Sequence, residues 1–320
     1  MSYKILNTIG QNFDPKAKSV LDELGEVDYL NLDQKSLEEK VSSYDVLVIG
    51  LGLVINKAVI NKAKNLKIIA TATTGLDHID ISYAESKSIS VLSLKGENEF
   101  LNSITGTAEL AFGLIIDLLR HISSSFESVK NYQWQREKFV GNNLSGKTLG
   151  LVGLGRLGMM MVNYGKAFGM EVIAFDPYLT DDKFSNNGCQ RVDFKTLLSQ
   201  SDVISIHVPL TDETENMFNS EAFSAMKESA ILINTARGKI VNEKDLLKAL
   251  EDRTIAGYTT DVLADELNFK IDFRNHPLIE YAKNNNNLII TPHIGGMTYE
   301  SRQKTDIFIA EKIKKYINKK

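Results

Sequence analysis

The sequence predicts an α/β protein with two domains, each a parallel sheet with flanking helices. Short runs rich in isoleucine, leucine and valine recur along the 320 residues, and each is followed by a longer segment with helical spacing. The runs fall into two sets, one in the first hundred residues and one after residue 146. Hydrophobic side chains make up 43% of the chain, which is enough to bury two cores.

The first set of runs predicts a small sheet of four or five strands. Strands that are covered by helices on both faces are apolar throughout rather than alternating. Four runs have this character and a fifth is weaker: residues 4–9, 45–50, 66–72 and 90–94, with 27–32 as the weaker candidate.

The second set predicts a larger sheet with six strands: residues 147–153, 171–176, 202–208, 230–236, 254–262 and 287–293. Six parallel strands are typical of a complete dinucleotide-binding fold. Residues 104–134, between the two sets, are apolar on nearly all sides in their middle, which predicts one long buried helix. Residues 299–317 predict a last helix, too short for a domain of its own, that packs back onto the first unit.

These elements define the expected domains. We expect a smaller, flavodoxin-like domain from residues 1–101 and 297–320, discontinuous in sequence, and a Rossmann dinucleotide-binding domain from residues 102–296. The hinge is expected just before the long helix.

Composition excludes several classes of protein. The formal net charge is −4, from 37 Lys and Arg against 41 Asp and Glu, which disfavours nucleic acid as a partner. Cys189 is the only cysteine and no secretory signal pattern opens the chain, so we expect a cytoplasmic protein. The longest apolar run, residues 110–119, is shorter than the roughly 20 residues of a membrane span, and no membrane segment is expected. No two histidines have metal-ligand spacing, so no metal site is expected.

A glycine motif marks the expected cofactor site. Gly153, Gly155 and Gly158 fit the pattern G-x-G-x-x-G between a predicted strand and a predicted helix that ends at Gly169. The first glycine permits a tight turn, the second lets a pyrophosphate approach the backbone, and the third lets helix and strand pack closely. The start of the helix then favours the bound anion.

An acidic residue follows at the end of the next predicted strand. Asp176 lies 23 residues after Gly153, at the position where a carboxylate accepts hydrogen bonds from the hydroxyls of an adenosine ribose. The same carboxylate would repel a 2′-phosphate. The sequence therefore predicts NAD rather than NADP as the cofactor.

Candidate catalytic residues follow other strands, because ligands of open α/β sheets bind at the carboxyl ends of the strands. Arg237 follows the strand 230–236, and its guanidinium suits a bidentate grip on a substrate carboxylate. His293 follows the last strand and is the best candidate for a proton donor to a carbonyl oxygen. A carboxylate on its far ring nitrogen would fix the ring and favour the charged form. Glu266 or Asp265 could supply it, and spacing does not choose between them.

The other histidines are not expected to donate protons, although one lies at a strand end near the expected cofactor. They are His78, His121, His276 and, at the strand end, His207. Each candidate also has a simpler interpretation, since an arginine after a strand is often a structural ion-pair partner and an Asp-Glu pair usually lies in a solvated turn.

The chain resembles the D-isomer-specific 2-hydroxyacid dehydrogenases over nearly its whole length. Seven motifs in family order carry the resemblance: residues 71–81, 107–120, 150–158, 207–214, 233–246, 261–266 and 291–298. Two positions depart from the family pattern. Leu267 stands where the family usually has proline after the catalytic glutamate, and Leu110 stands where members often have histidine.

The resemblance implies roles for individual residues. The family's catalytic arginine, glutamate and histidine fall on Arg237, Glu266 and His293, which favours Glu266 over Asp265. The positions implied to contact NAD are Gly153, Gly155, Arg156, Leu157, Gly158, Asp176, Val208, Pro209, Thr235, Ala236, Asp261, Gly295 and Gly296. Thr74, Gly75 and Leu76 are implied to lie near the substrate, together with Arg237.

The activity implied is NAD-dependent interconversion of a 2-keto acid and a D-2-hydroxy acid by hydride transfer, in a cleft that closes between the domains. The substrate pair 3-phosphoglycerate and 3-phosphohydroxypyruvate is one expectation, and a glyoxylate/hydroxypyruvate or D-lactate-type reductase is the alternative. An NAD-binding regulatory protein of the corepressor type is a further alternative. The resemblance also implies a homodimer through the region of the long helix.

Overall fold

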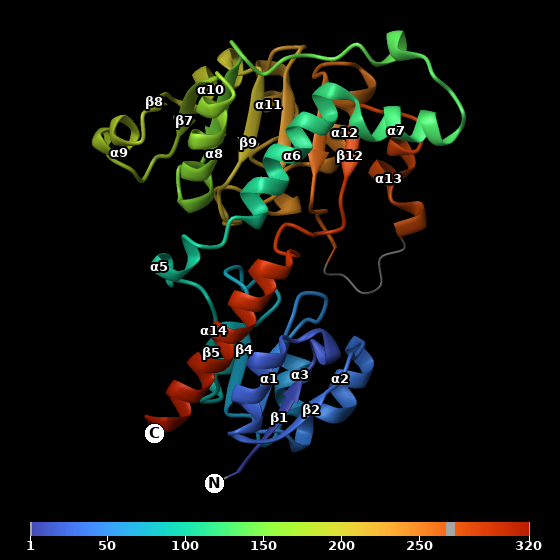
Figure 1. Ribbon diagram of the computed structural model, residues 1–320. Coiled ribbons are helices and arrows are strands. Elements are labelled where there is room, and N and C mark those ends of the chain that lie inside the picture. The colour runs from blue at the N-terminus through green and yellow to red at the C-terminus, as the bar shows by residue number, and fades with distance from the viewer. Residues whose placement is uncertain (1, 267–272, 320) are drawn as a thin grey trace. The chain divides into compact units, whose positions relative to one another are not determined.

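The computed structural model describes residues 2–266 and 273–319 (Figure 1). Backbone contacts divide the described residues into two units: unit 1, residues 2–104 and 297–319, and unit 2, residues 105–266 and 273–296. Each unit is a parallel sheet with flanking helices, which confirms the predicted fold class. Leu267, one of the departures from the family pattern, lies outside the described residues.

Unit 1 contains a five-stranded parallel sheet in the order β2-β1-β3-β4-β5. Its strands are β1 (Tyr3–Asn7), β2 (Gly25–Tyr29), β3 (Val46–Ile49), β4 (Ile68–Thr71) and β5 (Ser90–Leu92). The weak fifth strand expected at residues 27–32 is therefore confirmed, although it begins two residues earlier. It pairs with β1 on the edge of the sheet, where it needs fewer apolar side chains.

Helices cover both faces of this sheet. Along β3, Val46 and Val48 pack on one face with α1 (Pro15–Asp22) and the C-terminal helix α14 (Tyr299–Asn318). Leu47 and Ile49 pack on the other face with α2 (Gln34–Lys40), α3 (Lys57–Lys62) and α4 (Ile81–Ser86). This double burial explains why the strand is apolar at every position. The short helix α5 (Asn98–Leu101) belongs to a separate small cluster with Leu94 and Ile104.

Unit 2 contains a seven-stranded parallel sheet in the order β12-β11-β10-β9-β6-β7-β8. The six predicted strands are confirmed as β6 (Thr148–Val152), β7 (Glu171–Phe175), β9 (Val203–Ile206), β10 (Ile231–Asn234), β11 (Gly257–Thr260) and β12 (Leu288–Ile290). The sequence did not predict β8 (Gln190–Arg191), because two exposed polar residues carry no apolar pattern.

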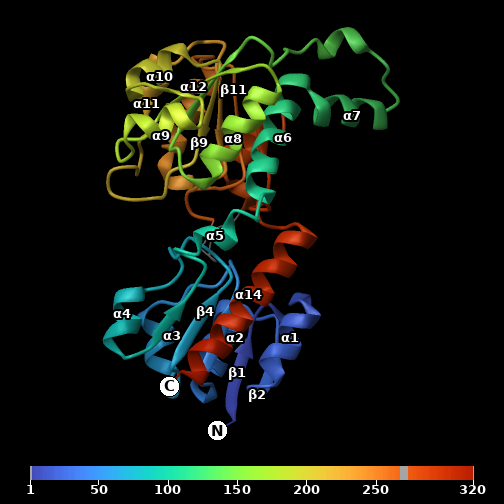
Figure 2. The same cartoon turned by 60° about the vertical axis from the view of Figure 1, so that its left-hand side comes forward.

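Two helical layers enclose the sheet of unit 2 (Figure 2). Along β10, Ile231 and Ile233 face the layer of α6 (Gly106–Arg120), α8 (Arg156–Ala167) and α9 (Asp181–Asn186). Leu232 faces the layer of α10 (Phe194–Gln200), α11 (Ser220–Ala225), α12 (Glu243–Glu251) and α13 (Pro277–Ala282). The candidate site residues follow the carboxyl ends of the strands.

The prediction of one long buried helix over residues 104–134 is wrong. The segment forms α6 and a separate helix α7 (Ile122–Lys130), and the break lies at His121, which has a left-handed backbone with φ of 54°. Eight residues of α6 are buried, whereas α7 buries none. The α7 apolar face, formed by Ile122, Phe126 and Val129, is exposed at helical spacing.

Residues Asn98–Arg120 are long and apolar enough, by length and composition alone, to cross a membrane. A core helix of a folded domain has the same composition. The apolar side chains of α6, among them Ala111 and Ile115, pack in one cluster with Leu149 and Leu151 of the sheet. Core packing therefore accounts for the hydropathy of this stretch.

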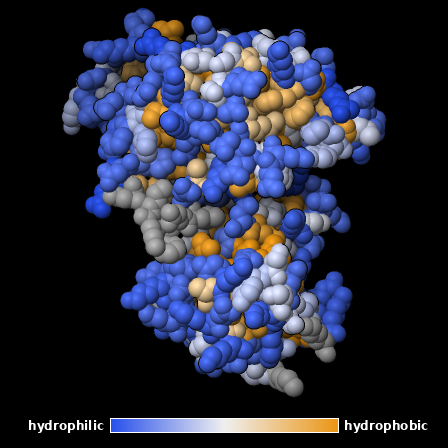
Figure 3. All heavy atoms as spheres, turned by 180° about the vertical axis from the view of Figure 1, so that it is seen from behind, coloured by the Kyte–Doolittle hydropathy of each residue, from blue (hydrophilic) through white to orange (hydrophobic). Residues whose placement is uncertain are grey.

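Hydrophilic residues dominate the face of the molecule seen from behind, with smaller hydrophobic areas between them (Figure 3). Exposed large apolar residues are normally scattered over a protein surface. Trp134, with 87% of its surface exposed, and Val140, with 75%, follow the α7 apolar face in sequence.

Candidate active site

The glycine motif forms the turn between β6 and α8. Gly153 has a left-handed φ of 94°, and a Cβ atom there would lie 2.7 Å from the carbonyl oxygen of His207. A Cβ on Gly158 would lie 2.3 Å from the carbonyl oxygen of Gly153. Both glycines are therefore required by the protein's own backbone. Gly155 differs, because no heavy atom of the described residues lies within 4 Å of the Cβ it lacks.

The open space at Gly155 fits a dinucleotide pyrophosphate. Gly155 is the N-cap residue of α8, and within the described chain no side chain caps this helix. The first backbone N–H groups of an α-helix have no partner within the helix, and the helix dipole favours an anion at this end. Arg156 and Leu157 form the first turn of the same helix.

Asp176 follows β7 and is fixed beside the glycine turn. Its Oδ2 atom accepts a hydrogen bond from the N–H of Leu154 at 3.0 Å, and its Oδ1 atom accepts one from the N–H of Tyr178 at 3.0 Å. These bonds hold the carboxylate at the carboxyl end of the strand, one strand away from the turn, where an adenosine ribose binds in this fold.

Arg237 lies just beyond β10, in a turn that Asn234 organises. The buried Asn234 accepts a hydrogen bond from the N–H of Ala236 at 3.0 Å and donates one to the carbonyl oxygen of Arg237 at 2.9 Å. The guanidinium of Arg237 donates from Nη1 to the carbonyl oxygen of Ala236 at 2.7 Å. Sequence reasoning missed Asn234, although an amide that ends a four-residue apolar strand is a visible signal.

Thr235, next to Arg237, has a buried hydroxyl group without a hydrogen-bond partner among the described residues. A buried hydroxyl without a partner is costly unless a ligand satisfies it. The carboxamide of a nicotinamide has the donor and acceptor that this hydroxyl lacks.

Asp261 follows β11 and holds the loop that carries His293. It is 1% exposed. Its Oδ1 atom accepts hydrogen bonds from Thr291 Oγ1 at 2.6 Å and from the N–H of Ile294 at 2.8 Å, and Oδ2 accepts one from the N–H of Gly295 at 2.7 Å. The carboxylate thus fixes the loop between β12 and α14.

His293 and Glu266 form a close pair. His293 Nδ1 lies 2.7 Å from Glu266 Oε1, and Glu266 Oε2 accepts the N–H of Leu263 at 3.3 Å. Because an ionised carboxylate only accepts, Nδ1 of His293 donates this hydrogen bond and Nε2 takes no part in it. Asp265 is 63% exposed and lies 3.9 Å from Lys239, so the carboxylate against the ring belongs to Glu266.

The backbone at His293 is left-handed, with φ of 53°. A histidine tolerates this conformation better than a branched residue does, yet it remains an uncommon one that clusters at functional sites. The ring is 27% exposed, which leaves it within reach of a ligand.

His207 is unsuited to proton donation at neutral pH. His207 is partly buried, with Nδ1 shielded from solvent and Nε2 2.9 Å from Ser205 Oγ, and burial lowers the pKa of His207 to about 4. The ring is therefore neutral at pH 7. Val208 and Pro209, the predicted cofactor contacts that follow it, continue the chain beyond β9.

In unit 1, the predicted substrate loop follows β4. The hydroxyl of Thr73 donates to the carbonyl oxygen of Gly75 at 2.8 Å and also lies 3.0 Å from the hydroxyl of Thr71. Leu76 packs against the core of the unit, while Thr74 is exposed. The role of this loop stays a prediction.

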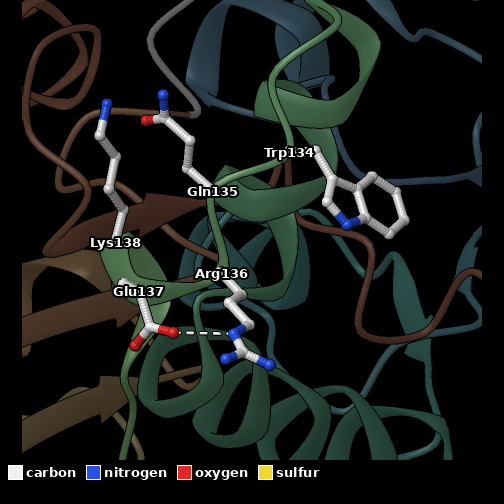
Figure 4. Close-up of a pocket in the computed structure, with 5 residues that line it drawn as sticks. All are labelled: Trp134, Gln135, Arg136, Glu137 and Lys138. Atoms are coloured by element: carbon white, nitrogen blue, oxygen red, sulfur yellow. Dashed lines mark hydrogen bonds and ion pairs between the residues drawn. The ribbon is translucent and has the colours of Figure 1, made fainter.

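A surface recess of about 640 Å³ lies elsewhere in unit 2 and is lined by the consecutive residues Trp134 to Lys138 (Figure 4). Their side chains point in different directions, and Arg136 pairs with its neighbour Glu137 at 2.7 Å. None of the candidate site residues lines it. Groups of three or more potential metal ligands do not occur in the described part of the chain.

The parallel sheet, the glycine turn and the acid after β7 define unit 2 as a dinucleotide-binding α/β domain. The family described as "D-isomer specific 2-hydroxyacid dehydrogenase, NAD binding domain" matches residues 112–295. The chain belongs to the D-isomer-specific 2-hydroxyacid dehydrogenase family and carries its NAD-binding domain.

Individual relatives cover most of the chain. It is 36% identical over 303 residues to D-3-phosphoglycerate dehydrogenase of Methanocaldococcus jannaschii. This match covers 94% of this chain and 55% of that protein. It is 35% identical over 288 residues to hydroxypyruvate reductase of Thermotoga maritima, covering 90% of each. The chain thus spans about half the length of the phosphoglycerate dehydrogenases that it matches.

Solved structures agree with the fold. D-lactate dehydrogenase from Aquifex aeolicus, in complex with NAD and lactic acid, superposes with a TM-score of 0.85 at 30% identity, covering 98% of this chain and 95% of that one.

Proposed function

We propose that this protein catalyses the NAD-dependent interconversion of a 2-keto acid and a D-2-hydroxy acid. The observation that carries the proposal is the His293–Glu266 pair, at 2.7 Å, in the same unit as the glycine turn and Arg237. A pyrophosphate site alone serves many reactions, whereas an acid-supported imidazole beyond β12 of the same sheet supplies the proton transfer that carbonyl reduction requires.

Each catalytic residue has one task in this scheme. Bound NADH supplies the hydride that is added to C2 of the keto acid. Arg237 binds the substrate carboxylate and polarises the carbonyl oxygen. Nε2 of His293 donates a proton to that oxygen, or accepts it in the reverse direction, while Glu266 stabilises the charged ring and fixes its orientation.

The remaining predicted residues divide between cofactor and substrate. In unit 2, the turn from Gly153 to Gly158 would hold the pyrophosphate and Asp176 the ribose, while Thr235 and the loop fixed by Asp261 would lie at the nicotinamide. In unit 1, Thr74, Gly75 and Leu76 would bind substrate through backbone amides. Unit 1 would then be the substrate-binding domain and unit 2 the cofactor-binding domain.

The substrate we place first is 3-phosphohydroxypyruvate, because relatives named D-3-phosphoglycerate dehydrogenase match 94% of the chain. The second candidates are hydroxypyruvate and glyoxylate, since relatives named for these substrates are equally similar, at 35% and 36% identity. Loss of NADH absorbance with each of these acids, and with pyruvate, identifies the substrate. If none of them oxidises NADH, the result would favour the alternative of an NAD-binding regulatory protein.

Replacement of His293 tests the proposed chemistry. The variant His293→Gln should lower kcat by about 10²–10⁴-fold, since general acid catalysis contributes that much. Gln cannot act as a general acid, which explains the lower kcat. It should leave the loop intact, so the affinity for NADH, measured by fluorescence titration, should stay unchanged.

A matched control is available in His121→Gln, because His121 has nearly the same left-handed backbone, with φ of 54° against 53°. This control should keep the wild-type kcat. Wild-type turnover in His293→Gln would remove His293 from the mechanism.

We also propose a homodimer. The α7 apolar face is exposed on a helix that buries none of its residues, with Phe126 62% exposed at its centre. Apolar residues at helical spacing on an exposed helix are typical of an interface, and a second copy of the chain would cover them.

A cytoplasmic location is the last part of the proposal. Cys189 is the only cysteine of the chain and is buried as a free thiol. Burial raises the pKa of this thiol, so the reactive thiolate is suppressed. A lone structural cysteine is typical of a reducing compartment.

A further inference from the structure

A second carboxylate–histidine pair lies behind the first in unit 2. Glu243, the first residue of α12, places Oε2 3.4 Å from Nε2 of His276, which precedes α13. The side chain of His276 is 7% exposed and that of Glu243 is 22% exposed. The contacts of Glu243 given by the structure are with His276 and Ala264. The proposed chemistry uses neither Glu243 nor His276.

The carboxylate of Glu243 reaches the turn that carries Glu266. Its Oε1 atom accepts the N–H of Ala264 at 2.8 Å. This turn closes on itself, because the N–H of Glu266 donates to the carbonyl oxygen of Leu263 at 3.3 Å. A hydrogen bond to the middle of so short a turn limits where Glu266 can lie.

The turn is also packed directly on the residue after Arg237. A Cβ atom on Gly238 would lie 2.1 Å from the carbonyl carbon of Leu263 and 2.3 Å from the nitrogen of Ala264. The turn therefore cannot move toward Gly238, and Glu243 restrains it from the helix α12. Burial raises the pKa of the Glu243 carboxyl. The hydrogen bond from the Ala264 N–H and the proximity of His276 act in the opposite direction, so these two partners favour the charged form of Glu243.

We propose that Glu243 is a positioning residue: by holding the N–H of Ala264, and itself held by His276, it sets the distance between Glu266 and the imidazole of His293. This inference rests on the proposed function for its catalytic consequence, but its structural consequence can be measured without any substrate.

The structural test observes the Nδ1 proton of His293 by NMR in the full-length protein labelled with ¹⁵N-histidine. A proton held between an imidazole and a carboxylate gives a low-field signal, which the variant His293→Gln assigns by removing it. Glu243→Ala should broaden or lose this signal, whereas Glu243→Gln should keep it, because the amide oxygen still accepts the N–H of Ala264.

The kinetic test uses the same variants. Glu243→Ala should lower kcat by roughly 10–100-fold, the size expected when a catalytic group is displaced by about 1 Å, with the KM for NADH unchanged. Glu243→Gln should restore most of kcat. The control is Glu221→Ala, an exposed acid in the first turn of α11 that should behave as wild type in both tests.

Either of two results would overturn the inference: an intact low-field signal with wild-type kcat in Glu243→Ala, or equal impairment of Glu243→Gln and Glu243→Ala. If Glu243→Ala does not fold, Glu243→Asp replaces it, since a side chain shorter by one methylene keeps the charge and cannot reach Ala264. Failure of the proposed function has a different signature, namely wild-type protein that retains the low-field signal and oxidises NADH with none of the keto acids.

Discussion

Single carboxylates hold the backbone at both ends of the candidate site. Asp176 binds the N–H of Leu154 in the glycine turn, and Asp261 binds the loop from Thr291 to Gly295. Both lie at strand ends, where the backbone leaves the sheet and loses its ladder partners. Residues that would contact a cofactor thus also fix the loops that present it.

The cofactor preference should depend on Asp176. Asp176→Ala removes a charged acceptor worth about 1.5–3 kcal/mol, so kcat/KM with NADH should fall by about 10–100-fold. The loss with NADPH should be smaller, because the carboxylate no longer repels the 2′-phosphate. Steady-state kinetics with both cofactors measures the ratio.

The exposed acid Asp182 in α9 provides the comparison, and Asp182→Ala should leave the ratio at its wild-type value. An unchanged preference for NADH in Asp176→Ala would show that the ribose is bound elsewhere.

Among the elements, α14 contains a buried acid that weakens the fold at neutral pH. Asp306 is 1% exposed, and its Oδ2 atom accepts the N–H of Asp14 at 3.1 Å and lies 3.4 Å from Nη2 of Arg302. No residue that the structure describes bonds its Oδ1 atom. Burial raises the pKa of Asp306 to about 6, although Arg302 and the Asp14 N–H act in the opposite direction.

A pKa raised on folding means that the folded state binds the proton more tightly than the unfolded state does. The stability from this proton is complete below the unfolded value of 3.8 and is lost as the pH rises through about 6. Asp306→Asn should therefore raise the free energy of unfolding at pH 8 by about 1–3 kcal/mol, and by less at pH 5.

Urea unfolding at the two pH values measures this difference. Glu311→Gln, an exposed acid on the same helix, should show no such pH dependence. A gain for Asp306→Asn that is equal at pH 5 and pH 8 would contradict the assignment.

At the scale of the whole molecule, assembly is the property that the α7 apolar face predicts. Phe126→Asp should raise the dissociation constant of the homodimer by at least about 30-fold, the loss typical of a central apolar contact. Sedimentation velocity over a range of concentrations measures the change.

Leu51→Asp places the same charge on an apolar residue of unit 1 that is 45% exposed, and it should leave the dimer intact. A wild-type protein that sediments as a monomer would refute the homodimer outright.

Much of the fold followed from patterns local to the chain. Strands that are buried on both faces are apolar at every position, so the runs around Leu47 and Leu232 could be recognised without any knowledge of their neighbours. The break at His121 could not, since neither glycine nor proline marks it and the apolar spacing continues into α7. The edge strand β8 was not predicted, because its two exposed polar residues carry no apolar pattern.

The sequence by itself determined the two parallel sheets, the glycine turn and the strand-end positions of Arg237 and His293, because each depends on neighbours within a few residues. Residue spacing did not choose between Glu266 and Asp265, and the family resemblance favoured Glu266, which the structure places against His293. Only the tertiary structure decided that Asn234 shapes the turn of Arg237 and that Glu243 reaches Ala264. These pairings join different elements of the chain. Their distances depend on how helices and strands pack together, which no local pattern of residues encodes.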